Sequence, residues 1–121
     1  MRNATRAYGA IANQTASPRE LEADLLLSAA ARLQAIRDGW ADKSPELDDA
    51  LLFNRKLWSI FVTAATNSGT SLPAALRQNV ANLGIFVFKQ TLAVQADPKP
   101  ETLGSLININ RELAAGLLTR A

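Results

Sequence analysis

Carboxylates are the residues of this chain whose spacing comes closest to catalytic or metal-binding chemistry. Glu20 and Asp24 lie four residues apart with Glu22 between them, so two of the three would share one face of a helix. Such a pair could transfer protons or hold a divalent cation. These residues stand in the first turns of a predicted helix, however, where the helix dipole favours negative charge. Asp48 and Asp49 have the same explanation at the next helix start, so we predict neither a catalytic nor a metal site.

The side chains that most enzymes use are absent from the sequence. With no histidine and no cysteine, the chain has no imidazole base, thiolate nucleophile, Ser-His-Asp triad or Cys or His ligand for zinc. Its six glycines are dispersed, and no phosphate loop, dinucleotide fingerprint or nucleophile elbow is present. We therefore predict that the protein is not an enzyme and needs no cofactor.

Length and charge narrow the class of protein further. The 121 residues fit a single helical domain over residues 1–121, and the formal net charge is only +2 although the pI is about 9.4. The longest cationic run is Arg55-Lys56, without the basic stripe and interleaved aromatics typical of nucleic-acid binding. No signal peptide or membrane-length apolar segment is visible. We predict a cytoplasmic protein that binds no membrane and does not bind RNA directly.

Composition and proline positions predict an all-α fold. Ala and Leu, with 22 and 18 residues, are strong helix formers, and prolines stand where helices should begin. Apolar residues recur at helical spacing between short connections, so sequential helices should pack antiparallel. The prediction is an antiparallel bundle of four long helices at about 18–39, 45–66, 73–95 and 100–119, with a short N-terminal helix at about 3–13.

Several local signals support these boundaries. Ser17 can cap the first long helix, and Glu20 three residues later can close a capping box. Residues 42–44 are expected to form a loop before the second long helix. Gly84 and Gly116 stand in mid-helix, where glycine costs roughly 1 kcal/mol relative to alanine. Close approach of a neighbouring helix is the expected reason for both.

Two asparagines interrupt the apolar stripes of their helices. Asn54 and Asn110 are each followed by an arginine, Arg55 and Arg111. A buried amide without partners costs about 1–3 kcal/mol, so both should be hydrogen-bonded. In one interpretation they bond to a backbone end or to each other and set the helix register. In the other they line a groove and contact an incoming helix.

Aromatic residues offer a second set of candidate contacts. Phe53 and Trp58 belong to one helix, and Phe86 and Phe88 belong to another. Adjacent residues on a helix point about 100° apart, so Phe86 and Phe88 should point some 200° apart and cannot both reach the same core. Most aromatics are expected in the core. Alternatively, one of them lies in an apolar groove that accepts an amphipathic helix.

Four short segments, in order along the chain, carry a family resemblance. They are SPRELE at 17–22, NRKLW at 54–58, LP at 72–73 with LR at 76–77, and LININR at 106–111 followed by GL at 116–117. Together they resemble the flagellar-biosynthesis regulator FlaF family of alphaproteobacteria over nearly the whole chain. The chain departs from the family pattern at Asn108, where Asp is usual, and at residues 86–88, where Trp is common.

The resemblance implies a flagellum-biogenesis factor that binds flagellin and promotes its synthesis and secretion as a chaperone or regulator. Flagellin termini are amphipathic helices that are disordered before assembly, so helix-in-groove contact would suit them. Alternatives are a regulator that acts directly on flagellin mRNA and a scaffold for FlbT, a regulator of that mRNA. The residues predicted to contact a partner are Phe53, Asn54, Arg55, Trp58, Phe86, Phe88, Asn110 and Arg111.

Two further expectations concern the groove when no partner is bound. Self-association could mask it, because most soluble oligomers are symmetric assemblies of one chain. The N-terminal helix has weak capping, so residues 1–13 could instead form a mobile segment that folds over the groove and leaves when a partner arrives.

Overall fold

The computed structural model describes residues 17–67 and 73–119, and these residues confirm the predicted all-α fold. The helix predicted at 3–13, and with it the mobile segment at 1–13, lies outside the described residues. The long helices are α2 (Pro18–Asp38), α4 (Leu47–Thr66), α5 (Ala74–Ala96) and α6 (Gly104–Thr119). Shorter elements are α3 (Trp40–Lys43) and the 3₁₀ turns η1 (Ser44–Glu46) and η2 (Pro100–Leu103).

The start of α2 is the capping box that the sequence predicts. The hydroxyl of Ser17 accepts a hydrogen bond from the Glu20 backbone N–H at 3.1 Å, and the Ser17 N–H donates to the Glu20 carboxylate at 3.3 Å. Pro18 occupies the first turn, where its missing N–H is not needed. The carboxylate of Glu20 is thus engaged with the helix end, as expected from its position.

The connection between α2 and α4 is helical, so the predicted loop at 42–44 is wrong. The N–H of Gly39 closes α2 on the carbonyl of Ala35, and the carbonyl of Gly39 then accepts from Asp42 and Lys43. These bonds build the single turn of α3, and η1 follows without a break. Turn-forming side chains can satisfy the backbone equally in a loop or in one helical turn, so composition does not separate the two.

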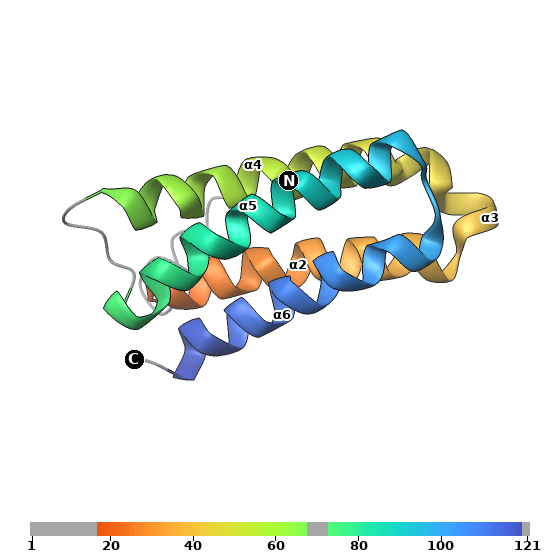
Figure 1. The fold of residues 1–121 in the computed structure, drawn as a ribbon. Helices are drawn as coiled ribbons and strands as arrows, with labels where there is room; N and C mark the ends of the chain where they lie inside the picture. The colour runs from red at the N-terminus through yellow and green to blue at the C-terminus, as the bar shows by residue number, and fades with distance from the viewer. Residues whose placement is uncertain (1–16, 68–72, 120–121) are drawn as a thin grey trace, which may run out of the picture.

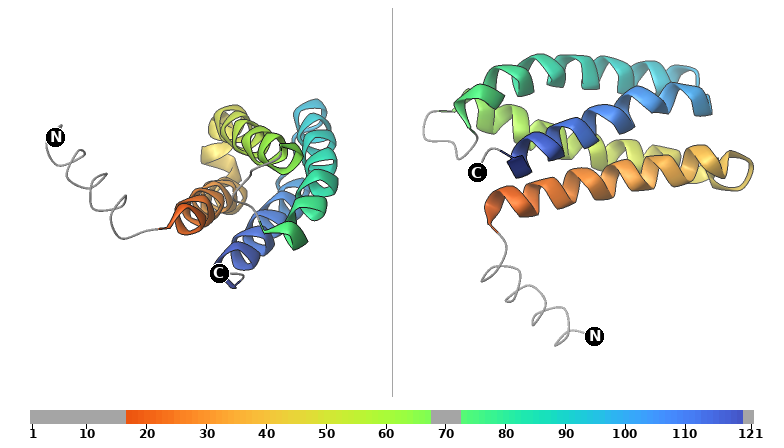
Figure 2. Two further views of the ribbon diagram at one scale, coloured as in Figure 1. Left: turned by 90° about the vertical axis from the view of Figure 1, so that its left-hand side faces the viewer. Right: turned by 90° about the horizontal axis from the view of Figure 1, so that it is seen from below.

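Four long helices surround one apolar core in the order α2, α4, α5, α6, with α6 packing back against α2 (Figure 1). The end-on view in Figure 2 shows α4 diagonally opposite α6. Sequential neighbours run antiparallel, as the short connections predict. The largest buried side chains come from all four helices and η2, and they include Trp58, Phe61, Leu26, Leu33, Ile36, Leu51, Leu103, Leu106, Ile107, Leu117, Val80 and Val87.

The two mid-helix glycines lie where neighbouring helices approach closely, as predicted. A Cβ added to Gly84 of α5 would overlap Cγ2 of Val62 on α4. A Cβ added to Gly116 of α6 would lie 3.3 Å from Cδ2 of Leu76 on α5. The loss of helix propensity at both glycines is therefore offset by tighter packing of α5 against its two neighbours.

Candidate partner-binding surface

Three of the predicted site residues form a hydrogen-bonded cluster inside the bundle. The indole N–H of Trp58 donates to Oδ1 of Asn110 at 2.8 Å, and Nδ2 of Asn110 donates to Oδ1 of Asn54 at 2.7 Å. A longer contact of 3.4 Å joins Nδ2 of Asn110 to the carbonyl of Leu26 on α2. The prediction that the two asparagines bond to each other is confirmed, and the bonds cross the bundle from α4 to α6.

The cluster is closed to solvent. Asn54, Trp58 and Asn110 are each 0% exposed, so none can contact a partner directly while the bundle stays closed. Trp58 also packs against Phe61 in a tilted arrangement, with ring centroids 6.2 Å apart. Within the described residues, Nδ2 of Asn54 has no hydrogen-bond partner. An incompletely satisfied amide costs stability but still specifies which residues of the helices face each other.

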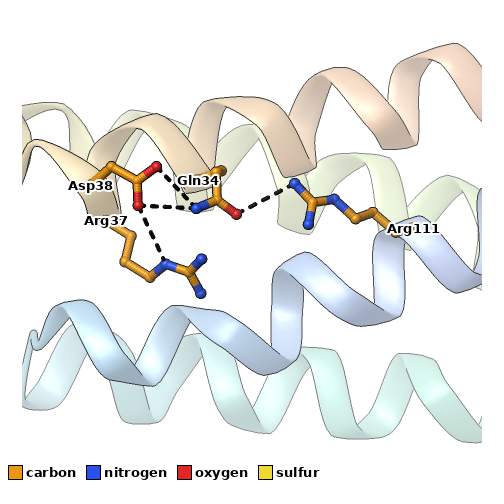
Figure 3. A network of polar contacts seen from close by, with 4 residues as sticks. All are labelled: Gln34, Arg37, Asp38 and Arg111. Atoms are coloured by element: carbon orange, nitrogen blue, oxygen red, sulfur yellow. Dashed lines mark hydrogen bonds and ion pairs between the residues drawn. The ribbon is translucent and has the colours of Figure 1, made fainter.

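Arg111 lies on the surface between α6 and α2. Its guanidinium donates to Oε1 of Gln34 at 3.3 Å, and Nε2 of Gln34 donates to both carboxylate oxygens of Asp38 at 3.0 Å (Figure 3). Arg37 approaches the same carboxylate at 3.8 Å. This exposed network links the two helices with the largest mutual contact, and exposed ion pairs of this kind contribute little to stability.

The remaining predicted residues lie on the outside of α4 and α5. Phe53 and Phe86 are about two-fifths exposed, at 37% and 42%, whereas Phe88 is half-buried and packs against the core. Phe86 and Phe88 therefore differ in environment, as the angle between them predicts. Arg55 is exposed, and its backbone carbonyl accepts from the hydroxyl of Ser59 at 3.0 Å.

Two adjoining hollows lie on the outer side of α4, and one of them reaches α5. One, of about 260 Å³, lies between the two helices and is lined by Arg55, Ser59, Phe88 and Leu92. The other, of about 410 Å³, extends along α4 and shares Ser59 in its lining. We call the first of these, which lies between the two helices, the α4–α5 groove. Phe88 and Arg55 are the predicted site residues that the structure brings into it.

Three residues of this surface are missing from the sequence-based site. Ile60 and Leu92 are each 66% exposed and Ile85 is 58% exposed, although all three are large apolar side chains. All three lie off the apolar stripes predicted for their helices, but an aliphatic side chain carries no polar or aromatic signal of partner contact, so its residue type gave no reason to select it. The charge pattern of the sequence could have pointed to this surface, because residues 50–96 contain no Asp or Glu.

The carboxylates behave as the helix-start explanation predicts, with one exception. Glu20 belongs to the capping box, and Asp48 and Asp49 lie in the first turn of α4. Glu22 is different, because its Oε1 is buried and has no hydrogen-bond partner among residues 17–67 and 73–119. Burial raises the pKa of the Glu22 carboxyl, and the nearby Arg19 charge opposes that rise. Across the described residues, no three acidic side chains gather as metal ligands would.

The fold and this surface define a four-helix bundle protein with an apolar hollow on its outer face. No helix in the described ranges is long and apolar enough to cross a bilayer. The family model described as flagellar protein FlaF matches residues 4–117, which is most of the chain. The chain therefore belongs to the FlaF family of flagellar proteins. No curated protein and no solved structure matches it.

Proposed function

We propose that this flagellar protein acts in the cytoplasm by binding flagellin, which it keeps from premature assembly and delivers for secretion. The protein works by binding and not by catalysis. A helix of flagellin lies in an apolar groove of the bundle, as amphipathic helices do in other groove-forming proteins. Promotion of flagellin synthesis would follow from the same contact, since bound flagellin is protected until it is exported.

One observation carries this proposal: a protein of a flagellar family exposes large apolar side chains along α4 and α5. Single exposed apolar residues are normal on a protein surface, but a hollow lined by apolar side chains, such as the one lined by Phe88 and Leu92, is typical of a binding site. Flagellin termini are amphipathic and disordered before assembly, so they have an apolar face to bury. Of the predicted contact residues, Arg55 and Phe88 line the α4–α5 groove, while Phe53, Phe86 and Arg111 are exposed outside its lining.

A binding assay with pure components tests the proposal. The protein is immobilised, and purified flagellin, purified FlbT and the flagellin mRNA leader are offered separately. We expect flagellin to be retained at micromolar concentration and the RNA not to be. Retention of FlbT without flagellin would support the scaffold alternative, and retention of RNA with steep salt dependence would support direct action on mRNA. Either result without flagellin binding refutes the chaperone function.

A further inference from the structure

The charged residues of this chain are distributed unevenly over the bundle. All eleven acidic residues lie before residue 50 or after residue 96, whereas Arg55, Lys56, Arg77 and Lys89 lie between. These limits enclose α4 beyond its first turn and the whole of α5. One half of the bundle therefore carries cations without acids, and it is the half that contains the α4–α5 groove.

Three cations of this half of the bundle have no acidic partner among the described residues. Ion pairs join Arg37 to Asp38 and Lys99 to Asp97. Arg55, Lys56 and Lys89 are exposed and take part in neither. The nearest acids along α4 are Asp48 and Asp49, two helical turns from Arg55 and Lys56.

The exposed faces of α4 and α5 carry both cations and apolar side chains. On α5, Ile85, Phe88, Lys89 and Leu92 are spaced three or four residues apart and share one face. Phe88 and Leu92 line the hollow between the helices, and Arg55 of α4 lines its opposite side. The groove is thus largely apolar with the Arg55 cation in its lining, and the exposed Lys89 lies beside it on the same face of α5 as Leu92.

We infer that the α4–α5 groove binds an amphipathic helix whose apolar stripe is flanked by Asp or Glu. The apolar stripe covers Phe88 and Leu92, and the flanking carboxylates reach Arg55 in the groove lining and Lys89 beside the groove on the exposed face of α5. We assign this helix to flagellin, and in this assignment the inference rests on the proposed function. A helix suits a channel between two helices because its side chains pack into the groove as ridges, which a flat lipid surface cannot do.

Two synthetic peptides of about four helical turns test the chemistry independently of flagellin. Both carry a leucine stripe, which is flanked by Glu in one peptide and by Lys in the other. Titration calorimetry with the full chain should show the Glu peptide binding at least about tenfold more tightly at low salt, with the difference shrinking as salt screens the charges. Equal binding of the two peptides, or tighter binding of the Lys peptide, overturns the inference.

Variants of the protein locate the site with both the Glu peptide and purified flagellin as probes. Leu92→Ser and the double variant Arg55→Glu/Lys89→Glu should each weaken binding at least about tenfold. Leu25→Ser on α2, also an exposed leucine, and Lys43→Glu on α3 are matched controls that should change it less than about twofold. Circular dichroism checks that each variant is folded. Because the substituted residues are exposed, all variants are expected to fold like the wild-type protein.

The outcomes separate this inference from the proposed function. If flagellin binds the wild-type protein and the groove variants equally, the groove assignment is refuted and the function stands. If flagellin does not bind while the Glu peptide does, the function is refuted and the chemistry of the groove stands. Binding of phosphatidylserine vesicles or of homopolymer RNA in place of the Glu peptide overturns the inference. So does a dimer in sedimentation equilibrium that Leu92→Ser dissociates, because the groove would then belong to a second copy.

Discussion

Replacing Gly84 by alanine tests how closely α4 and α5 approach each other beneath the groove. The new Cβ would overlap Cγ2 of Val62. Valine has one strongly preferred χ1 rotamer in a helix, so Val62 cannot turn aside without cost. The overlap must therefore be relieved by moving α5 away from α4 or by straining the Val62 side chain.

Two effects of opposite sign decide the outcome of Gly84→Ala. Alanine in the middle of a helix is favoured over glycine by roughly 0.5–1 kcal/mol. Overpacking a close contact costs about 1–3 kcal/mol, so the substitution should lower the free energy of unfolding by about 1 kcal/mol in the wild-type background. In a Val62→Ala background the overlap is absent, and the same substitution should raise the free energy of unfolding by roughly 0.5–1 kcal/mol.

Urea unfolding followed by circular dichroism measures the four proteins of this double-mutant cycle, with a constant m-value as the check on two-state behaviour. Gly104→Ala serves as a control, because a Cβ there would lie 3.6 Å from the Arg37 guanidinium, an ordinary contact. A change of sign between the two backgrounds is the expected result. If Gly84→Ala stabilises the wild-type protein as much as the Val62→Ala variant, the close approach of α4 and α5 is wrong.

Two further substitutions test the buried polar groups. Asn110→Leu removes the acceptor of the Trp58 indole N–H and the donor to Asn54, so urea unfolding should show a loss of about 1–3 kcal/mol, which shrinks in a Trp58→Phe background. An unchanged loss in that background would contradict the hydrogen bond. For Glu22, burial raises the pKa more than Arg19 lowers it, so the folded state holds the proton more tightly than the unfolded chain. Stability should therefore fall as the pH rises from the ordinary glutamate value of about 4.3 toward the raised value. Glu22→Gln should raise the melting temperature at neutral pH but not below that range, and an equal rise at both would contradict the sign.

Much of the fold was predictable because its signals are local. The capping box at Ser17, the prolines at helix starts and the 3.6-residue periodicity each depend on neighbours in sequence, and the long helices end within a few residues of the predicted limits. Residues 42–44 were predicted as a loop because the helical turn that includes Asp42 and Lys43 is held by bonds to Gly39 that no periodicity signals. The mid-helix positions of Gly84 and Gly116 predicted close approach of a neighbouring helix. Which residues they contact, Val62 and Leu76, depends on how the helices pair.

Less of the candidate surface could be predicted from the sequence. The polarity of Asn54 and Asn110 revealed that they needed partners, and mutual bonding was one of two open interpretations. Trp58 joins the two asparagines because α4 and α6 lie diagonally opposite each other across the core. This placement is a tertiary property, so Trp58 could not be predicted as the third member of the hydrogen-bonded cluster. Whether Leu92 faces water or the core follows from the rotation of α5 in the bundle, since its own residue type fits either place.

The register of α4 connects the buried hydrogen bonds to the outer groove. Asn54 faces the core and Arg55, the next residue, lines the groove; Trp58 and Ser59 repeat this pair one turn later. Because successive residues lie about 100° apart, a slip of α4 by one position would turn Arg55 toward the core and bury an unpaired charge. The bonds from Asn110 to Asn54 and Trp58 disfavour such a slip, since they are lost if either side chain leaves the interior. The same two bonds that order the core therefore determine which cation and which hydroxyl α4 offers to a partner, although no partner can reach them.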